Sequence, residues 1–292
     1  MWAREVVVGA DGSAASLAAV GWAARAAERH RVPLRVVLAY HWDRASARSA
    51  GEMQLRSARD GVAEADAARA VTHAQAAAPG VEIRRETVIG PAVPNLLTAA
   101  RDARLLVVGH PGHGRVGSVL TGSVAQAVAS HAPCPVVVVR GRADAVTGPI
   151  VVGVDGSTSS LETLGLAFDE AAGQAAALVP VLAVAPMSGP WGDIAEQSCL
   201  SSGARLAEEA ALAEWLAPWR EKHPEVVVRP LVLRGNAAPT LVDQSRTARL
   251  VAVGSRGHGG LAATLIGSVG QHLLHHAGCP VMINRRWPVN YR

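Results

Sequence analysis

Two glycine-rich segments, one in each half of the chain, have the residue types and spacing of a phosphate-binding loop. One spans Gly109 to Ser123 and the other spans Gly254 to Ser268, and each has the pattern Gly-x2-Gly-x9-Gly-Ser. Glycines leave room for a phosphate to approach backbone N–H groups. A helix that begins at the Gly-Ser pair adds its first N–H groups and its dipole. The pattern therefore predicts two sites for a phosphorylated ligand.

An aspartate stands upstream of each glycine segment, in a turn that follows a short apolar run. Asp11 lies in the segment Val7–Ser13 and Asp155 in the matching segment Val151–Ser157. A carboxylate can accept a hydrogen bond from an exocyclic amine or from a ribose hydroxyl, which suits adenosine. The alternative is that each Asp-Gly-Ser forms only a turn and a helix cap. Because a glycine segment follows each aspartate, we favour the interpretation that the aspartates bind a ligand.

These blocks belong to an internal repeat that covers nearly the whole chain. The aspartates are 155 − 11 = 144 residues apart, and the glycine segments are 254 − 109 = 145 residues apart. Two more pairs of blocks match at the offset of 145: Gly90–Pro94 with Gly235–Pro239, and His131–Val136 with His276–Val281. Four blocks in one order predict two copies of a domain, at residues 1–142 and 148–292. The short linker, residues 142–148, predicts that the two copies pack together.

Each copy is predicted to have five strands that alternate with four helices. The strands are expected at 5–9, 34–39, 81–88, 105–108 and 136–139, and again at 150–154, 177–183, 226–233, 250–253 and 281–283. This alternation predicts an α/β fold of two tandem Rossmann-like domains, each a five-stranded parallel sheet with helices on both faces. Ligands bind such sheets at the carboxyl ends of the strands, where the strand order reverses. If the first and fourth strands are neighbours, Asp11 and Gly109 open onto one crevice.

The composition excludes several other classes of protein. The 292 residues are 49% hydrophobic and only 3% aromatic, so the core is expected to be built from Val, Leu, Ile and Ala. A net charge of +4 without a basic run or a basic–aromatic stripe does not indicate nucleic acid. Neither a signal peptide nor a membrane span is predicted. Three cysteines without a CxxC pair favour a reduced cytoplasmic protein, and no metal site is predicted.

The glycine pattern together with the upstream Val-Gly-x-Asp-Gly-Ser turn resembles the universal stress protein family. The resemblance runs from about residue 4 to residue 285, and it is to the tandem form and the ATP-binding subclass. It implies an adenine nucleotide alpha hydrolase-like fold with one ATP in each domain. Mg²⁺ is a candidate to bridge the phosphates.

The resemblance also implies roles for individual residues. Asp11 and Asp155 are expected at the adenosine end, and the other members lie near the adenine, the ribose or the phosphates. The predicted nucleotide-binding residues are Gly9, Asp11, Ala39, Gly109, Gly112, His113, Gly114, Arg115, Gly122, Ser123 and Val124 in the first copy, and Gly153, Asp155, Ala183, Gly254, Arg256, Gly257, His258, Gly259, Gly267, Ser268 and Val269 in the second. The copies differ before the second glycine, where Arg256 replaces Pro111. If this arginine touches phosphate, the two sites differ in affinity.

Three functions are compatible with these patterns. The first is a nucleotide-dependent regulator of stress or growth state with little or no hydrolysis, because no catalytic set recurs beside the glycine segments. The second is an enzyme, either a slow ATP hydrolase or an adenylating enzyme, in which the equivalent residues His113 and His258 touch phosphate. The third is an assembly module without functional nucleotide. The resemblance implies that the two domains pair through their last strands. A homodimer and a regulatory protein partner are further candidates.

Overall fold

The computed structural model describes residues 5–40, 51–110, 123–185, 200–257 and 266–285; for residues 51–60 and 200–202 it describes the helical backbone alone. By its contacts, the chain forms two compact units, made mainly of residues 1–144 and 145–284. No helix in the described part of the chain is both long and apolar enough to cross a membrane.

The first unit alternates strands with helices, as the sequence predicts. Its elements in chain order are β1 (Val6–Ala10), α1 (Ala14–His30), β2 (Leu34–Tyr40), α2 (Gly51–Ala77), β3 (Ile83–Ile89), α3 (Ala92–Ala99), the 3-10 helix η2 (Ala100–Asp102), β4 (Leu105–Gly109), α4 (Ser123–His131) and β5 (Val136–Val139).

The second unit repeats this order. Its elements are β6 (Ile150–Gly153), α5 (Thr158–Gly173), β7 (Leu178–Val184), α7 (Leu200–Lys222), β8 (Leu231–Arg234), α8 (Ala237–Ser245), β9 (Leu250–Gly254), α9 (Ser268–His276) and β10 (Val281–Asn284). The predicted α/β class and the parallel sheet of each copy are confirmed.

The strand order places the first and fourth strands of each unit side by side. It is β3-β2-β1-β4-β5 in the first unit and β10-β9-β6-β7-β8 in the second, and the described pairs within each unit are parallel. In the first unit Val7 lies opposite Arg35 of β2 and Leu106 of β4. The order therefore reverses at β1, and the carboxyl ends of β1 and β4 meet at one edge of the sheet.

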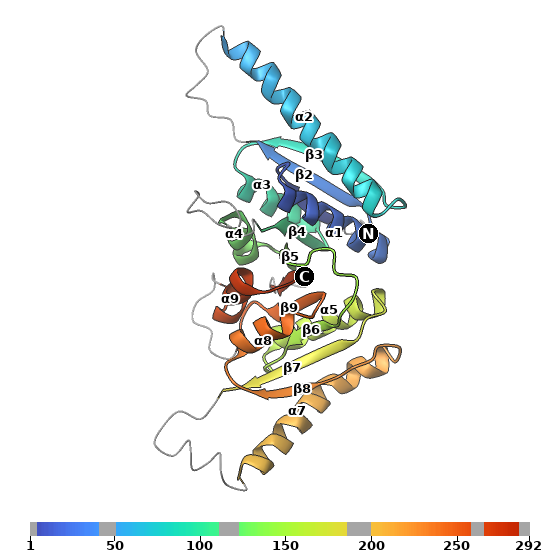
Figure 1. The fold of residues 1–292 in the computed structure, drawn as a ribbon, viewed down its shortest axis with the longest axis vertical. Coiled ribbons are helices and arrows are strands. Elements are labelled where there is room, and N and C mark those ends of the chain that lie inside the picture. Colours follow the sequence, from blue (N-terminus) through green and yellow to red (C-terminus); the bar gives the residue numbers. More distant parts are fainter. Residues whose placement is uncertain (1–4, 41–50, 111–122, 186–199, 258–265, 286–292) are drawn as a thin grey trace, which may run out of the picture. The chain divides into compact units, whose positions relative to one another are not determined.

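Helices cover both faces of each sheet, which explains the continuous apolar strands. In the first unit α1 and α2 pack on one face while α3 and α4 pack on the other (Figure 1). Residues Val6–Val8 of β1 and Val136–Val138 of β5 are fully buried. A strand that is buried on both faces is apolar along its length instead of alternating. The last strand in each order is less buried: Arg84 and Arg85 are exposed in β3, and Arg234 is exposed in β8.

The predicted strand at 226–233 is wrong in its first half. β8 begins only at Leu231, and before it Val228 makes a single bridge to Leu178. Pro230 separates the bridge from the strand. A proline cannot donate a backbone hydrogen bond to a neighbouring strand, so it interrupts the ladder at this point.

Candidate functional site

A cavity of about 270 Å³ opens at the carboxyl ends of β1 and β4, where the strand order of the first unit reverses. Six of the residues that the sequence singles out lie on its wall: Gly9, Asp11, Ala39, Gly109, Ser123 and Val124. They come from β1, β2, β4, α4 and the turn after β1. The fold thus brings together residues that are far apart in the sequence.

The wall of the cavity has an apolar part and two polar parts. Val37, Leu96 and Val108 provide apolar surface from β2, α3 and β4. The turn after β1 provides Asp11 and Ser13, the first turn of α1 provides Ser16, and the first turn of α4 adds residues 123–125. An apolar wall suits a flat ring, a carboxylate suits a hydroxyl or an amine, and a helix N-terminus suits an anion.

The Asp11 turn is held by a local set of hydrogen bonds. The Ser13 N–H donates to Asp11 Oδ1 at 3.0 Å, and the Asp11 N–H donates to Ser16 Oγ at 3.3 Å. Ser13 is also the N-cap of α1, since its hydroxyl accepts from the Ser16 N–H at 3.1 Å. The turn is therefore an Asx turn with a helix cap, and it presents the Asp11 carboxylate to the cavity as well.

The surroundings of Asp11 favour its ionised form. Partial burial raises the pKa of this carboxyl. Hydrogen bonds from the side chains of Ser13 and Ser16 and from backbone N–H groups lower the pKa by a larger amount, so the net pKa is below the usual value. A depressed pKa in the folded state adds stability that is fully present above the unfolded-state pKa and is lost as the pH falls through the folded-state pKa. Asp11 is therefore an acceptor at neutral pH.

The turn after β6 repeats this geometry. The N–H of Ser157 donates to Asp155 Oδ1 at 3.0 Å, and the hydroxyl of Ser157 donates to the same oxygen at 2.6 Å. The other carboxylate oxygen, Oδ2, lies so near Gly257 that a Cβ on this glycine would collide with it. Asp155 and Gly257, which the sequence places in one site, are thus in contact.

The N-terminus of α9 is bonded to the residue that follows β9. Gly267 is the N-cap of α9 and Ser268 is its first helical residue. Ser123 is likewise the first residue of α4. The N–H of Gly267 donates to the carbonyl of Ser255 at 2.8 Å. The N–H groups at the start of a helix have no acceptor within the helix, which leaves those of Ser268 and Val269 suited to an anion.

Packing explains two of the glycines that the sequence assigns to ligand binding. A Cβ on Gly109 would collide with the backbone carbonyl of Ala15 in α1, and a Cβ on Gly254 would lie 2.6 Å from Ser159 Oγ in α5. Each glycine lets the end of a strand pack closely on a helix. Positive φ is required instead at Gly12 (+75°) and Gly156 (+80°), in the turns after the aspartates.

The remaining predicted residues have varied positions. Gly153 ends β6, Ala183 lies half-buried in β7, and Arg256 is exposed after β9. Seven predicted residues lie outside the described part of the chain: Gly112, His113, Gly114, Arg115, Gly122, His258 and Gly259.

The sequence did not indicate the apolar wall of Val37, Leu96 and Val108, because only the register of the sheet and the packing of α3 bring these residues to the cavity.

Comparison with known proteins matches this chain to one family twice. The model of the universal stress protein family matches residues 3–140 and residues 147–285. The chain is 36% identical over 291 residues to universal stress protein Rv2623 of Mycobacterium tuberculosis (strain ATCC 25618 / H37Rv), with 96% of each chain covered. It is 34% identical over 294 residues to a universal stress protein of Mycolicibacterium smegmatis, again with 96% of each covered.

The fold is similar to that of a solved structure. The crystal structure of a universal stress protein from Archaeoglobus fulgidus covers 98% of this chain and all of its own, with a TM-score of 0.70 and 16% sequence identity. At this identity the likeness shows a shared fold.

Proposed function

Because this chain belongs to the universal stress protein family, with two such domains in tandem, we propose that it is a nucleotide-dependent regulator that binds one ATP in each domain. The observation that carries the proposal is the cavity of the first domain. There an ionised Asp11, an apolar wall and the N-terminus of α4 face one space of about 270 Å³.

Each part of this wall has a separate role in the proposal. The Asp11 carboxylate accepts from the ribose or from the exocyclic amine, and Val37 and Leu96 contact the base through apolar surface. Ser123 and Val124 at the start of α4 donate N–H groups to the phosphates. Mg²⁺, when bound, neutralises part of the phosphate charge.

A role in binding is favoured over a role in catalysis by the ionisable groups at the cavity. Among the described residues on its wall, Asp11 is the one ionisable side chain. Hydrolysis of ATP requires a group that orients or deprotonates the attacking water in addition to the binding groups. A hydrolase or an adenylating enzyme remains the second hypothesis, and an assembly module without functional nucleotide is the third.

The release of phosphate from Mg-ATP separates the first two hypotheses. The purified full-length protein is incubated with radiolabelled ATP at a concentration that saturates both sites, and free phosphate is measured over several hours. We expect bound ATP to persist, with a release rate close to that of buffer alone. Repeated turnover that Asp11→Ala and Asp155→Ala together abolish would establish the enzyme hypothesis instead.

The proposal also includes a cytoplasmic location, pairing of the two domains through their last strands, and a homodimer. Light scattering after size-exclusion chromatography, with and without Mg-ATP, measures the mass of the particle. A mass of about 60 kDa, twice that of the 30.1 kDa chain, is expected for the homodimer.

Gly267→Val is expected to block the site of the second domain at little cost to the fold. Gly267 has φ −58°, which any residue adopts, and a Cβ there would lie 3.3 Å from the carbonyl oxygen of Ser255. The isopropyl group would stand beside the N–H groups that begin α9. Isothermal titration should give one equivalent of Mg-ATP instead of two, with the free energy of unfolding reduced by about 1 kcal/mol or less. Two equivalents bound to a folded Gly267→Val protein would show that this helix start does not hold phosphate.

A further inference from the structure

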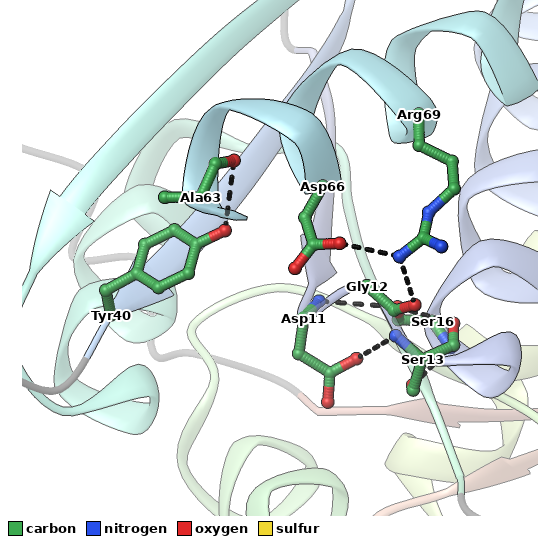
Figure 2. Close-up of polar contacts among 8 residues, drawn as sticks. All are labelled: Asp11, Gly12, Ser13, Ser16, Tyr40, Ala63, Asp66 and Arg69. Atoms are coloured by element: carbon green, nitrogen blue, oxygen red, sulfur yellow. Dashed lines mark hydrogen bonds and ion pairs between the residues drawn. The ribbon is translucent and has the colours of Figure 1, made fainter. Parts of the chain in front are cut away.

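The turn that carries Asp11 is bonded to the side chains of helix α2. Arg69 donates from Nη2 to the carbonyl oxygen of Gly12 at 3.0 Å and to Asp66 Oδ1 at 2.6 Å (Figure 2). Asp66 and Arg69 are three residues apart on one face of the helix. A single guanidinium nitrogen therefore links α2 to the backbone of the turn.

The contact lies one peptide bond away from the Asp11 carboxylate. In the peptide between Gly12 and Ser13, the carbonyl accepts from Arg69, and the N–H donates to Asp11 Oδ1 at 3.0 Å. A cation on the carbonyl polarises the peptide and makes its N–H a stronger donor, because consecutive hydrogen bonds reinforce one another. Figure 2 shows the chain of contacts from Asp66 through Arg69 and this peptide to Asp11.

Two further observations place α2 close against the turn. A Cβ on Gly12 would lie 2.5 Å from the carboxylate of Asp66, so the backbone and this side chain are in direct contact. The Tyr40 hydroxyl at the end of β2 donates to the carbonyl of Ala63 in α2 at 3.1 Å. Burial raises the pKa of Tyr40, and the charges of Asp66 and Asp11 raise it further, as expected if both carboxylates lie near this ring.

The second domain has a different side chain beside the equivalent turn. Trp215 of α7 occupies the place beside Gly156 that Asp66 occupies beside Gly12, with ring atom Cζ2 2.6 Å from a Cβ built on Gly156. The serine two residues after the aspartate bonds it in both domains, and in the second the Ser157 hydroxyl donates to Asp155 at 2.6 Å. An indole cannot hold an arginine on the turn as a carboxylate can.

We propose that Arg69, held by Asp66, is a positioning residue for the Asp11 carboxylate, and that it makes the ligand affinity of the first domain dependent on the position of α2. This inference rests on the proposed function, because the role given to Arg69 requires that Asp11 binds a nucleotide. Arg69 is more than half exposed, and an exposed ion pair adds little to stability. Its loss should therefore alter the carboxylate and leave the fold intact.

The test uses the full-length protein with Asp155→Ala, so that only the first site is titrated with Mg-ATP. Arg69→Ala is expected to weaken binding about 5- to 10-fold, Arg69→Lys to recover part of the loss, and Asp66→Asn to have an intermediate effect. Arg84→Ala is the matched control, because Arg84 of β3 is also exposed and also forms an ion pair, with Glu82. In the Asp11→Ala background, Arg69→Ala should leave the affinity of the second site unchanged.

A second readout requires no nucleotide. The ¹³C shift of the Asp11 carboxyl carbon, assigned with Asp11→Asn, is followed through an acid titration of the ligand-free protein. Arg69→Ala should raise the pKa of Asp11, and Arg84→Ala should not. An unchanged pKa in a folded Arg69→Ala protein would overturn the proposal, as would an equal loss of affinity in both sites. If no variant binds ATP, the proposed function fails, while the pKa of Asp11 still tests the contact with Arg69.

Discussion

Asp11→Ala is expected to reduce the number of Mg-ATP molecules bound per chain from two to one, and Asp155→Ala should do the same for the other site. Each aspartate lies in its own domain, and Asp11 is bonded to Ser13 and Ser16 of the same domain. A hydrogen bond to a charged group is worth about 1.5–3 kcal/mol, so the affinity of the altered site should fall about 10- to 100-fold. Isothermal titration of the two single variants and the double variant measures this directly.

Asp11→Asn is the control for this experiment. An asparagine can still accept from the Ser13 N–H, so it retains the turn that begins α1 while it removes the charge. If Asp11→Asn binds as weakly as Asp11→Ala, the carboxylate itself is required. Binding of two equivalents by the double alanine variant would remove both aspartates from the site.

Gly109→Ala is expected to destabilise the protein by about 2–3 kcal/mol, which corresponds to a fall in Tm of about 5 °C or more. The added Cβ would meet the carbonyl oxygen of Ala15 and lie 2.9 Å from the backbone nitrogen of Ser16. Backbone atoms at the start of a helix cannot rotate away as a flexible side chain can, so β4 and α1 must separate. Thermal unfolding followed by circular dichroism measures the change.

Two other glycines serve as matched controls. Gly254→Ala in the equivalent strand should cost less, because its nearest neighbour is the Oγ of Ser159, a side-chain atom that can rotate, and the nearest backbone atom lies farther away, at 3.0 Å. Gly61→Ala in α2 should stabilise the protein by about 0.5–1 kcal/mol, since a Cβ there would meet no heavy atom within 4 Å. Equal stability of Gly109→Ala and Gly61→Ala would contradict the packing role of Gly109.

The sequence predicted the elements whose patterns repeat. The two copies and their parallel sheets follow from the alternation of apolar runs and helices, and the structure confirms them. The adjacency of the first and fourth strands was only a condition in the sequence argument, and the structure shows it. The convergence of Asp11, Gly109 and Ser123 on one cavity follows from the same topology, because the carboxyl ends of neighbouring parallel strands share an edge.

Other features depend on tertiary contacts that no local pattern encodes. Gly109 looks like a ligand-binding glycine in the sequence, yet the helix on which it packs also requires a glycine there. The late start of β8 depends on a single proline at the boundary of the strand. Asp66 and Arg69 lie in a long helix rich in alanine and charged residues, where nothing distinguishes them from solvated side chains.

The most direct test of the central claim is the nucleotide content of the purified full-length protein. The protein is heat-denatured, the released small molecules are identified by mass spectrometry, and a parallel sample is melted with and without Mg-ATP. We expect about two equivalents of adenine nucleotide per chain, or a stabilisation of roughly 2.7 kcal/mol per site when ligand is added at about 100 times the Kd. Absence of released nucleotide together with an unchanged Tm would contradict the proposal and favour the assembly module.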